Sequence, residues 1–112
     1  MPSRLSGAYR AMWLFALFDL PTTTKAARKR YTRFRKFLLN EGFVMMQFSV
    51  YAKYCASEES AKTHRQHIKQ NLPSDGQVRV LGVTERQFAK MEVYYGKKRA
   101  KVEDPPLQMT FW

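Results

Sequence analysis

The sequence predicts a single α+β domain in which strands and helices alternate around one hydrophobic core. Two observations support this prediction. Apolar runs with strand-like spacing occur before and after segments whose apolar residues follow the helical repeat. The chain also has 112 residues, of which 45% are hydrophobic, and this suffices for one core and little else. We expect a tail over residues 1–11, the folded domain over 12–96, and a basic linker with a terminal strand over 97–112.

The first predicted strand runs from Met12 to Phe18 and is apolar on both faces. A strand of this kind is covered on both sides, and in so small a protein a second subunit could supply one cover. The segment Pro21-Thr22-Thr23-Thr24 is expected to supply a turn and a threonine cap for a helix that extends to about Asn40 and is ended by Gly42. At 100° per residue, one stripe of this helix is apolar and faces the core: Ala27, Tyr31, Phe34 and Leu38.

The middle of the chain predicts two strands followed by a second helix. Phe43 to Tyr54 is long for one strand, so we expect a kink, a bulge or a tight reversal near Gln47 to Ser49 that divides it into two strands. Ser57 is expected to cap a helix that ends near Asn71, with two glutamates in the first turn, where the helix dipole favours them. The inner side of this helix is predicted to hold Ala61, His64, Ile68 and Leu72.

The remaining segments complete the fold prediction. A fourth strand is predicted from Gln77 to Val83 and a short helical turn from Thr84 to Lys90. Further strands are predicted at Met91 to Tyr95 and Leu107 to Trp112. The order strand, helix, two strands, helix, strand therefore predicts a ferredoxin-like βαββαβ domain with extra C-terminal strands.

The chain is strongly basic, with 20 Lys and Arg against 9 Asp and Glu and a formal net charge of +11. Such a charge attracts polyanions, of which nucleic acid is the first candidate and an anionic membrane surface the second. The longest apolar run, Ala11 to Phe18, is too short to cross a bilayer, which requires about 20 such residues. We therefore expect a cytoplasmic protein that binds nucleic acid and no membrane.

One side of the first helix collects cations with no acid among them to balance their charge. Like charges at this spacing repel one another, which favours a phosphate-binding surface over a merely solvated one. Binding of this kind weakens steeply with salt, because each neutralised phosphate releases counterions. The candidate nucleic-acid-binding residues are Lys25, Arg28, Lys29, Arg33, Arg35 and Lys36. The later run from Lys97 to Lys101 is expected to be a solvated stretch.

Asp19 is the only acid among the first forty residues and ends the first predicted strand. Its carboxylate could simply accept hydrogen bonds from the turn at Thr22 to Thr24. Alternatively it is a catalytic Mg²⁺ ligand, because Mg²⁺ usually takes one or two carboxylates together with waters and phosphate. No second acid or histidine lies near it in the sequence. The metal hypothesis therefore requires a pair of Asp19 residues across a dimer axis.

Other residues with chemical potential are interpreted as structural. His64 and His67 lie three apart on the second predicted helix, but no third metal ligand is in view. We therefore expect His64 at the edge of the core and His67 on the surface. Cys55 is the single cysteine, which excludes an internal disulfide, and it is expected to be a small packed residue.

Two motifs resemble the CRISPR-associated protein 2 family. The first is Phe-Ala-Leu-Phe-Asp-Leu-Pro at Phe15 to Pro21, followed by a basic helix that ends at Glu41-Gly42. The second is Gln-Phe-Ser-Val-Tyr at Gln47 to Tyr51, which is similar to that family's Gln-x-Ser-Val-aromatic signature. The resemblance covers roughly Met12 to Val83. The tail resembles variants that accompany a Cas9-type effector, which implies that effector complex as a further partner.

The resemblance implies a homodimer whose sheets pack face to face and bring Asp19 near the dimer axis. It implies an architectural role in spacer acquisition, in which the dimer bridges CRISPR-associated protein 1 integrase dimers and holds the duplex DNA of a prespacer. The alternative that it implies is a metal-dependent endonuclease that acts on RNA or DNA. Ala52 stands where many relatives carry an acid, and this departure counts against nuclease activity.

The terminal segment suggests a partner-binding strand. One of its faces, made by Leu107, Met109 and Phe111, is apolar and could extend a sheet edge of the dimer mate or of the integrase. A third hypothesis for the whole chain is a ferredoxin-like RNA-binding module or ribosomal protein. The aromatic-rich strand signature of RNA recognition motifs is missing, so this hypothesis is the weakest of the three. Preferential binding of single-stranded RNA over duplex DNA would favour it.

Overall fold

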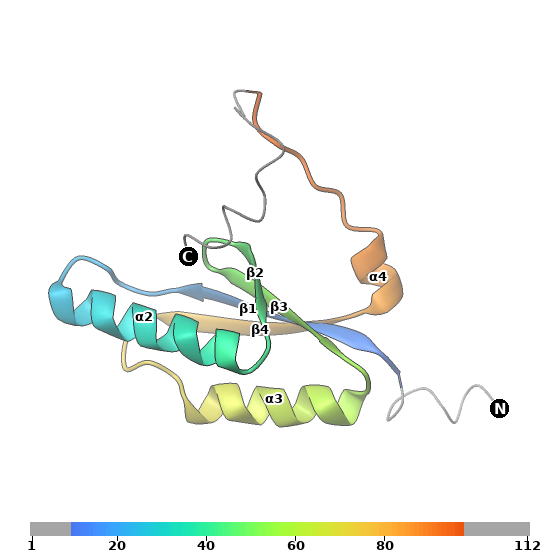
Figure 1. Ribbon diagram of the computed structural model, residues 1–112, viewed down its shortest axis with the longest axis horizontal. Helices are drawn as coiled ribbons and strands as arrows, with labels where there is room; N and C mark the ends of the chain where they lie inside the picture. The colour runs from blue at the N-terminus through green and yellow to red at the C-terminus, as the bar shows by residue number, and fades with distance from the viewer. Residues whose placement is uncertain (1–9, 98–112) are drawn as a thin grey trace.

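The computed structural model describes residues 10–97 of the chain. Four antiparallel strands form one sheet in the order β2-β3-β1-β4. Helices α2 and α3 cover one face of that sheet (Figure 1). The predicted ferredoxin-like α+β plan is therefore confirmed. The elements are β1 (Met12–Asp19), α2 (Lys25–Asn40), β2 (Val44–Gln47), β3 (Val50–Cys55), α3 (Glu58–Gln70), β4 (Gln77–Thr84) and α4 (Glu85–Ala89).

The core lies between the sheet and the two long helices. Alternate residues of β1 point into it, and Leu14, Ala16 and Phe18 are buried there. Leu38 of α2 and Ile68 of α3 pack against them from the helical side. Fully burying a side chain of this size contributes about 1.5–3 kcal/mol, so these contacts hold α2 and α3 on the sheet. Trp13, Phe15 and Leu17 of β1 face the opposite side and remain partly exposed.

Local capping interactions set the two ends of α2 as predicted. The Thr24 side chain accepts a hydrogen bond of 3.0 Å from the backbone N–H of Ala27. At the other end Gly42 has a φ of 97°, a conformation that glycine adopts without steric cost. The backbone N–H of Phe43 then donates to the carbonyl of Leu38 at 3.0 Å. This turn is a Schellman motif, and it directs the chain from α2 into β2.

The predicted reversal lies between β2 and β3, at Phe48 and Ser49. A register shift between Met45 and Gln47 places a bulge just before this turn. Tyr31 of α2 donates a hydrogen bond of 3.1 Å to the carbonyl of Phe48. The hairpin is thereby attached to the helix that carries all six candidate nucleic-acid-binding cations.

Two predictions near the end of the domain are wrong. Met91 to Tyr95 forms no strand, and the segment leaves the sheet after α4 (Figure 1). Its side chains are exposed. A strand needs a neighbouring backbone, and within the described residues of one subunit none lies beside this segment. Leu72 is 51% exposed rather than on the inner side of α3, because the helix ends two residues before it.

The structure describes only part of the three segments into which the sequence analysis divided the chain. The predicted terminal strand with Leu107, Met109 and Phe111 lies outside the described residues, as does most of the predicted N-terminal tail. The division into 1–11, 12–96 and 97–112 therefore stays a prediction. Among the described helices, none is long and apolar enough to cross a membrane.

Candidate functional site

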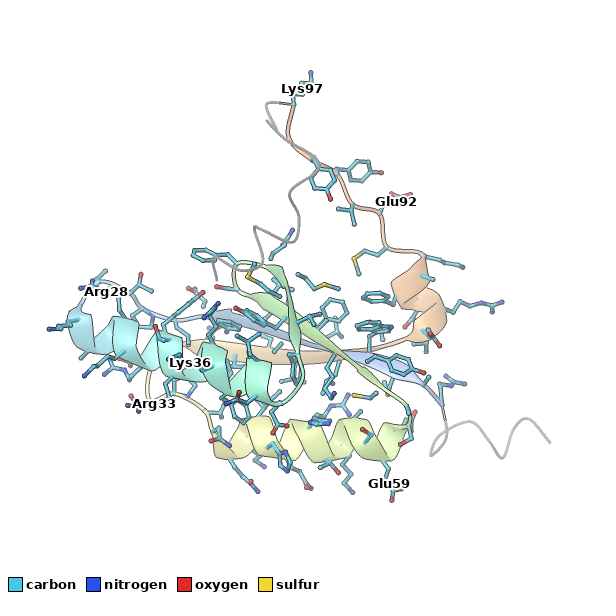
Figure 2. All side chains as sticks on the ribbon, viewed as in Figure 1. Arg28, Arg33, Lys36, Glu59, Glu92 and Lys97 are labelled. Atoms are coloured by element: carbon cyan, nitrogen blue, oxygen red, sulfur yellow. The ribbon has the colours of Figure 1, made fainter. Side chains whose placement is uncertain are left out.

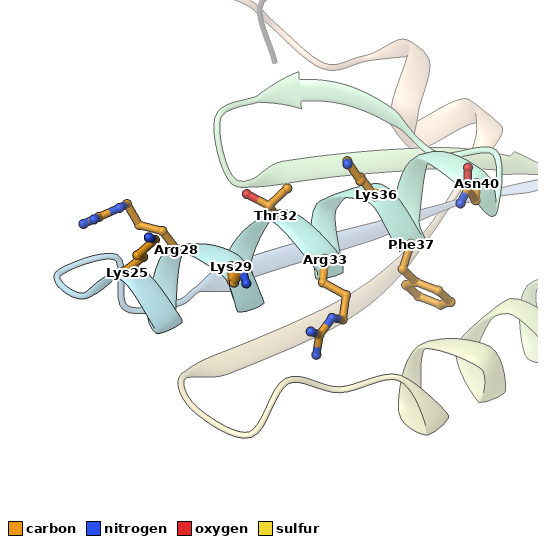
Figure 3. Close-up of a pocket in the computed structure, with 8 residues that line it drawn as sticks. All are labelled: Lys25, Arg28, Lys29, Thr32, Arg33, Lys36, Phe37 and Asn40. Carbon is orange, nitrogen blue, oxygen red and sulfur yellow. The ribbon is translucent and has the colours of Figure 1, made fainter.

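The exposed side of α2 carries a dense group of cations, shown on the ribbon in Figure 2 and in close-up in Figure 3. Their side chains line a shallow surface hollow together with Thr32, Phe37 and Asn40. Within the described part of the chain, none of these cations forms an ion pair. We call this surface the α2 basic face; its cations are Lys25, Arg28, Lys29, Arg33 and Lys36.

The helix dipole makes this arrangement costly for α2 itself. The first turn of α2 holds no acid, and Lys25 and Arg28 lie near its N-terminus, where the dipole disfavours positive charge. Helix α3 has the opposite pattern, with Glu58 and Glu59 in its first turn and Lys69 in its last. Each misplaced charge costs about 0.3–1 kcal/mol at the surface. The charges of α2 therefore do not stabilise the helix, which favours a role in binding an anion.

Arg35 does not belong to this face, although the sequence analysis placed it there. Its side chain is half-buried, and its Nε atom is shielded from solvent, as is the hydroxyl of Tyr51 on β3. Burial raises the pKa of Tyr51, and the neighbouring Arg35 partly opposes that effect. The reason lies in helix geometry: Arg35 is four residues from Tyr31, so the two are about 40° apart around the axis. Arg35 therefore sits at the edge of the core-facing stripe.

Asp19 ends β1 and is exposed. It is paired with Gln77 of β4, on the sheet face that α2 and α3 leave uncovered. Leu17, Gln77 and Arg79 line a small hollow beside it. The structure thus places Asp19 at an accessible strand end, and its role as a catalytic or metal-binding residue stays a prediction.

The surroundings of Asp19 do not provide a magnesium site within one subunit. Mg²⁺ takes octahedral oxygen ligands, usually from one or two carboxylates completed by waters and phosphate. Asp19 brings one carboxylate, and the hollow also contains the cation Arg79, which repels a metal ion. In the described residues, Asp19 belongs to no cluster of three metal-ligating side chains. A second subunit would have to supply the missing carboxylate.

The uncovered sheet face is largely apolar. Trp13 and Phe15 of β1 lie on it, and Phe88 of α4 stacks on Trp13 with ring centroids 3.9 Å apart. The short helix α4 thereby shields one end of the face. On the neighbouring strands, Tyr54 beside Trp13 is 45% exposed and Leu81 beside Phe15 is 53% exposed. We call Trp13, Phe15, Leu17, Tyr54 and Leu81 the open sheet face.

A third group of residues was missed by the sequence analysis. The Nδ1 atoms of His64 and His67 lie 2.6 and 3.0 Å from the same Glu41 oxygen, Oε1. Burial opposes ionisation of Glu41, but the hydrogen bonds from both histidines outweigh it and lower the pKa of this carboxyl. His67 is therefore no isolated surface residue, and the two histidines do have a third potential ligand beside them. Glu41 is 23 residues from His64 in sequence, so no local spacing could reveal the contact.

Cys55 is buried as predicted, with 1% of its surface exposed. Burial raises the pKa of its thiol, since the interior disfavours the thiolate, and nearby Lys53 only partly opposes this. Its neutral thiol packs against the core between the sheet and α3. The cysteine is thus a structural residue and not a nucleophile.

Comparisons with known proteins agree on one family. The family model "CRISPR associated protein Cas2" matches residues 12–91. A protein of Parvibaculum lavamentivorans named "CRISPR-associated endoribonuclease Cas2" is 50% identical over 101 residues, which are 90% of this chain and 100% of that protein. A protein of the same name from Flavobacterium psychrophilum is 45% identical over 104 residues, 93% of this chain and 90% of that one.

The fold is also shared with a solved structure. A protein described as "Crystal structure of cas2" superposes with a TM-score of 0.54 at 17% identity, over 82% of this chain and 97% of that one. At this identity the likeness concerns the fold alone. The match of the family model to most of the chain, together with relatives about half identical over nine-tenths of it, establishes that the chain belongs to the Cas2 family of CRISPR-associated proteins.

Proposed function

We propose that the protein is an architectural subunit of the CRISPR spacer-acquisition complex that holds duplex DNA through the α2 basic face. The observation that carries this proposal is the set of five cations on α2 with no ion-pair partner among the described residues. Sixteen residues of helix span about 24 Å. That length matches several successive phosphates of a duplex, so the face contacts the backbone without reading bases.

The proposal includes a homodimer formed through the open sheet face. A largely apolar face on a small protein is a typical protein-binding surface. Leu81 and Tyr54 are about half exposed, and the remaining surface of Trp13 and Phe15 is continuous with them across paired strands. Sheet-to-sheet packing of two copies would bury this face. It would also place two α2 basic faces on one particle, which doubles the phosphate contacts.

Duplex binding can be tested by removing three charges from the α2 basic face. The variant Lys29→Gln, Arg33→Gln, Lys36→Gln is compared with Lys62→Gln, Arg65→Gln, Lys69→Gln on α3, which removes the same charges from another surface. The slope of log affinity against log salt should fall by up to about 0.9 for each phosphate that is no longer neutralised. The α3 variant should keep the wild-type slope. Equal effects of both variants would show that only net charge matters, and would refute binding by the α2 basic face.

The integrase partnership needs its own test. Purified CRISPR-associated protein 1 integrase would be supplied with prespacer duplex and with no added protein, the wild-type protein or the α2 variant. We expect integration only with the wild-type protein, because the bridge would be unable to hold the duplex in the other two cases. Integration at the same rate in all three would refute the architectural role.

A metal-dependent endonuclease is the second candidate, and its support is that curated relatives are named endoribonucleases. Asp19 is the candidate catalytic residue. It lies on the same side of the sheet as the open sheet face, so the proposed dimer would bring the Asp19 side chains of the two subunits together. The test is cleavage of RNA and of duplex DNA with Mg²⁺ by wild-type protein and Asp19→Ala. Cleavage that disappears in the variant while integration persists would separate the two functions. Cleavage that survives in Asp19→Ala would remove Asp19 from the active site.

A further inference from the structure

Glu41, His64 and His67 form a cluster between the end of α2 and the last turns of α3. Of all the His, Cys, Asp and Glu side chains that the structure describes, only these three form a group of three whose ligand atoms lie within 4.8 Å of one another. We propose that this cluster binds one Zn²⁺ ion per subunit. Neither the α2 basic face nor Asp19 contributes to it, so the site is separate from the proposed nucleic-acid binding and from the proposed nuclease.

The ligand types select zinc over magnesium. Two imidazoles and one carboxylate are a common set for Zn²⁺, which binds three protein ligands and a water in open tetrahedral sites. Mg²⁺ prefers an all-oxygen octahedral shell that two imidazoles cannot provide. Imidazole also suits other late first-row ions such as Co²⁺ and Ni²⁺. These ions can therefore serve as probes of the same site.

The side chains already converge on one point. The Nδ1 atoms of His64 and His67 approach the same Glu41 oxygen at 2.6 and 3.0 Å. Two ligands bound tetrahedrally to one Zn²⁺ lie about 3.3–3.5 Å apart, given metal–ligand distances of about 2.0–2.2 Å. The side chains therefore need to separate by less than about 1 Å to admit the ion. The ion would occupy the place of the Nδ1 protons, while each neutral imidazole carries its proton on Nε2 instead.

The backbone holds the three ligands in place. His64 and His67 are three residues apart on α3, so they share one face of that helix. Glu41 is the C-cap of α2, where its N–H donates to the carbonyls of Phe37 and Leu38 at 3.0 and 3.1 Å. The following turn at Gly42 prevents the helix from continuing. The three ligand residues therefore lose little conformational entropy when the Zn²⁺ ion binds, which favours high affinity.

The cluster is sheltered but reachable. The side chains of Glu41 and His64 are 19% and 20% exposed, whereas that of His67 is 44% exposed. An ion can therefore enter past His67, and a water can complete the tetrahedron on that side. The chain contains two histidines in all, and both are in this cluster. Any Zn²⁺ that the protein binds through imidazole must therefore bind at this cluster, so measured binding can be assigned to it.

The test uses the full chain without an affinity tag and Zn²⁺ as the only added metal. Titration calorimetry and competition with a chromophoric chelator should give one ion per subunit, and Zn²⁺ should raise the thermal midpoint because it binds the folded state. His67→Gln should weaken binding at least tenfold. This variant is preferred because His67 is the more exposed histidine and the protein should still fold. His64→Ala and Glu41→Gln should have the same effect.

Two matched variants and one spectroscopic measurement complete the design. Glu59→Gln removes a similar charge from an exposed position on α3 and should bind Zn²⁺ like the wild type. Cys55→Ala should also bind normally, because the thiol is buried outside the cluster. Co²⁺ should give the visible absorption of a tetrahedral complex in wild-type protein and lose it in His67→Gln. The absence of stoichiometric Zn²⁺ binding, or binding that His67→Gln leaves unchanged, would overturn the proposal and leave a hydrogen-bonded link between the helices.

Discussion

The open sheet face can be tested with a single leucine. Leu81 lies in β4 opposite Phe15 of β1 and is 53% exposed in the single subunit. If two copies pack through this face, the remaining half of the Leu81 surface is buried in the dimer. Leu81→Ala removes most of that buried surface, but it leaves the helix-facing core unchanged. The variant should therefore fold normally and dimerise more weakly.

The size of the effect follows from the exposed fraction. Complete burial of a leucine side chain contributes about 1.5–3 kcal/mol. Since about half of the Leu81 surface remains to be buried, each copy should contribute about 0.8–1.5 kcal/mol to association. A two-fold dimer contains two copies, and each 1.4 kcal/mol corresponds to about a tenfold change in the dissociation constant. Leu81→Ala should thus weaken the dimer by roughly 10- to 100-fold.

Sedimentation equilibrium over a range of protein concentrations measures this dissociation constant directly. The matched control is Leu72→Ala, because Leu72 is also a leucine and is 51% exposed, but it lies after α3 and away from the open sheet face. Circular dichroism of both variants should match that of the wild type. If both substitutions change the dissociation constant equally, or if neither does, the reasoning that places the dimer interface on this face is wrong.

Three further predictions concern the domain itself. Gly42→Ala should destabilise the protein by about 1–2 kcal/mol in urea unfolding, because a φ of 97° is unfavourable for alanine. The contact of the new Cβ with Lys53 Nζ adds little to this cost, since the lysine side chain can move. An unchanged unfolding midpoint would contradict the role given to Gly42 at the end of α2. Tyr31→Phe should cost about 0.5–1.5 kcal/mol through loss of the hydrogen bond to the Phe48 carbonyl, and a change confined to experimental error would show that the bond contributes nothing. Cys55 in the folded protein should react slowly with a thiol reagent and reach half of its maximal rate only above pH 9, because burial raises its pKa from the ordinary value of 9.0. Rapid labelling of the folded protein at pH 8 would refute the last prediction.

Much of the fold could be predicted because its signals are local. Thr24 and Gly42 bound α2 through hydrogen bonds to residues at most five positions away. The stripe formed by Ala27, Phe34 and Leu38 is buried as the helical repeat indicates. Capping and periodicity are properties of consecutive residues, so the sequence contains them in full.

The α2 basic face was also largely predictable, with one instructive error. Five of its six predicted cations line the same surface, whereas Arg35 turns toward Tyr51. Whether a residue at the boundary of a helical face points toward the core or toward solvent depends on the element that packs there. Here that element is β3, and its position depends on how α2 crosses the sheet.

The chain's composition and local patterns thus predict the order of its elements from β1 to α4, the ends of its helices, its basic helix and its resemblance to the Cas2 family. Tertiary packing alone decides three other features. It brings Glu41 within hydrogen-bonding distance of His64 and His67, residues 23 and 26 positions away. Among the described residues, it directs the segment from Met91 to Tyr95 away from the sheet, where the segment forms no strand, and it places the two long helices α2 and α3 on the same face of the sheet. These features depend on contacts between distant segments, and such contacts are determined by the angles at which helices and strands pack and not by the spacing of residues along the chain.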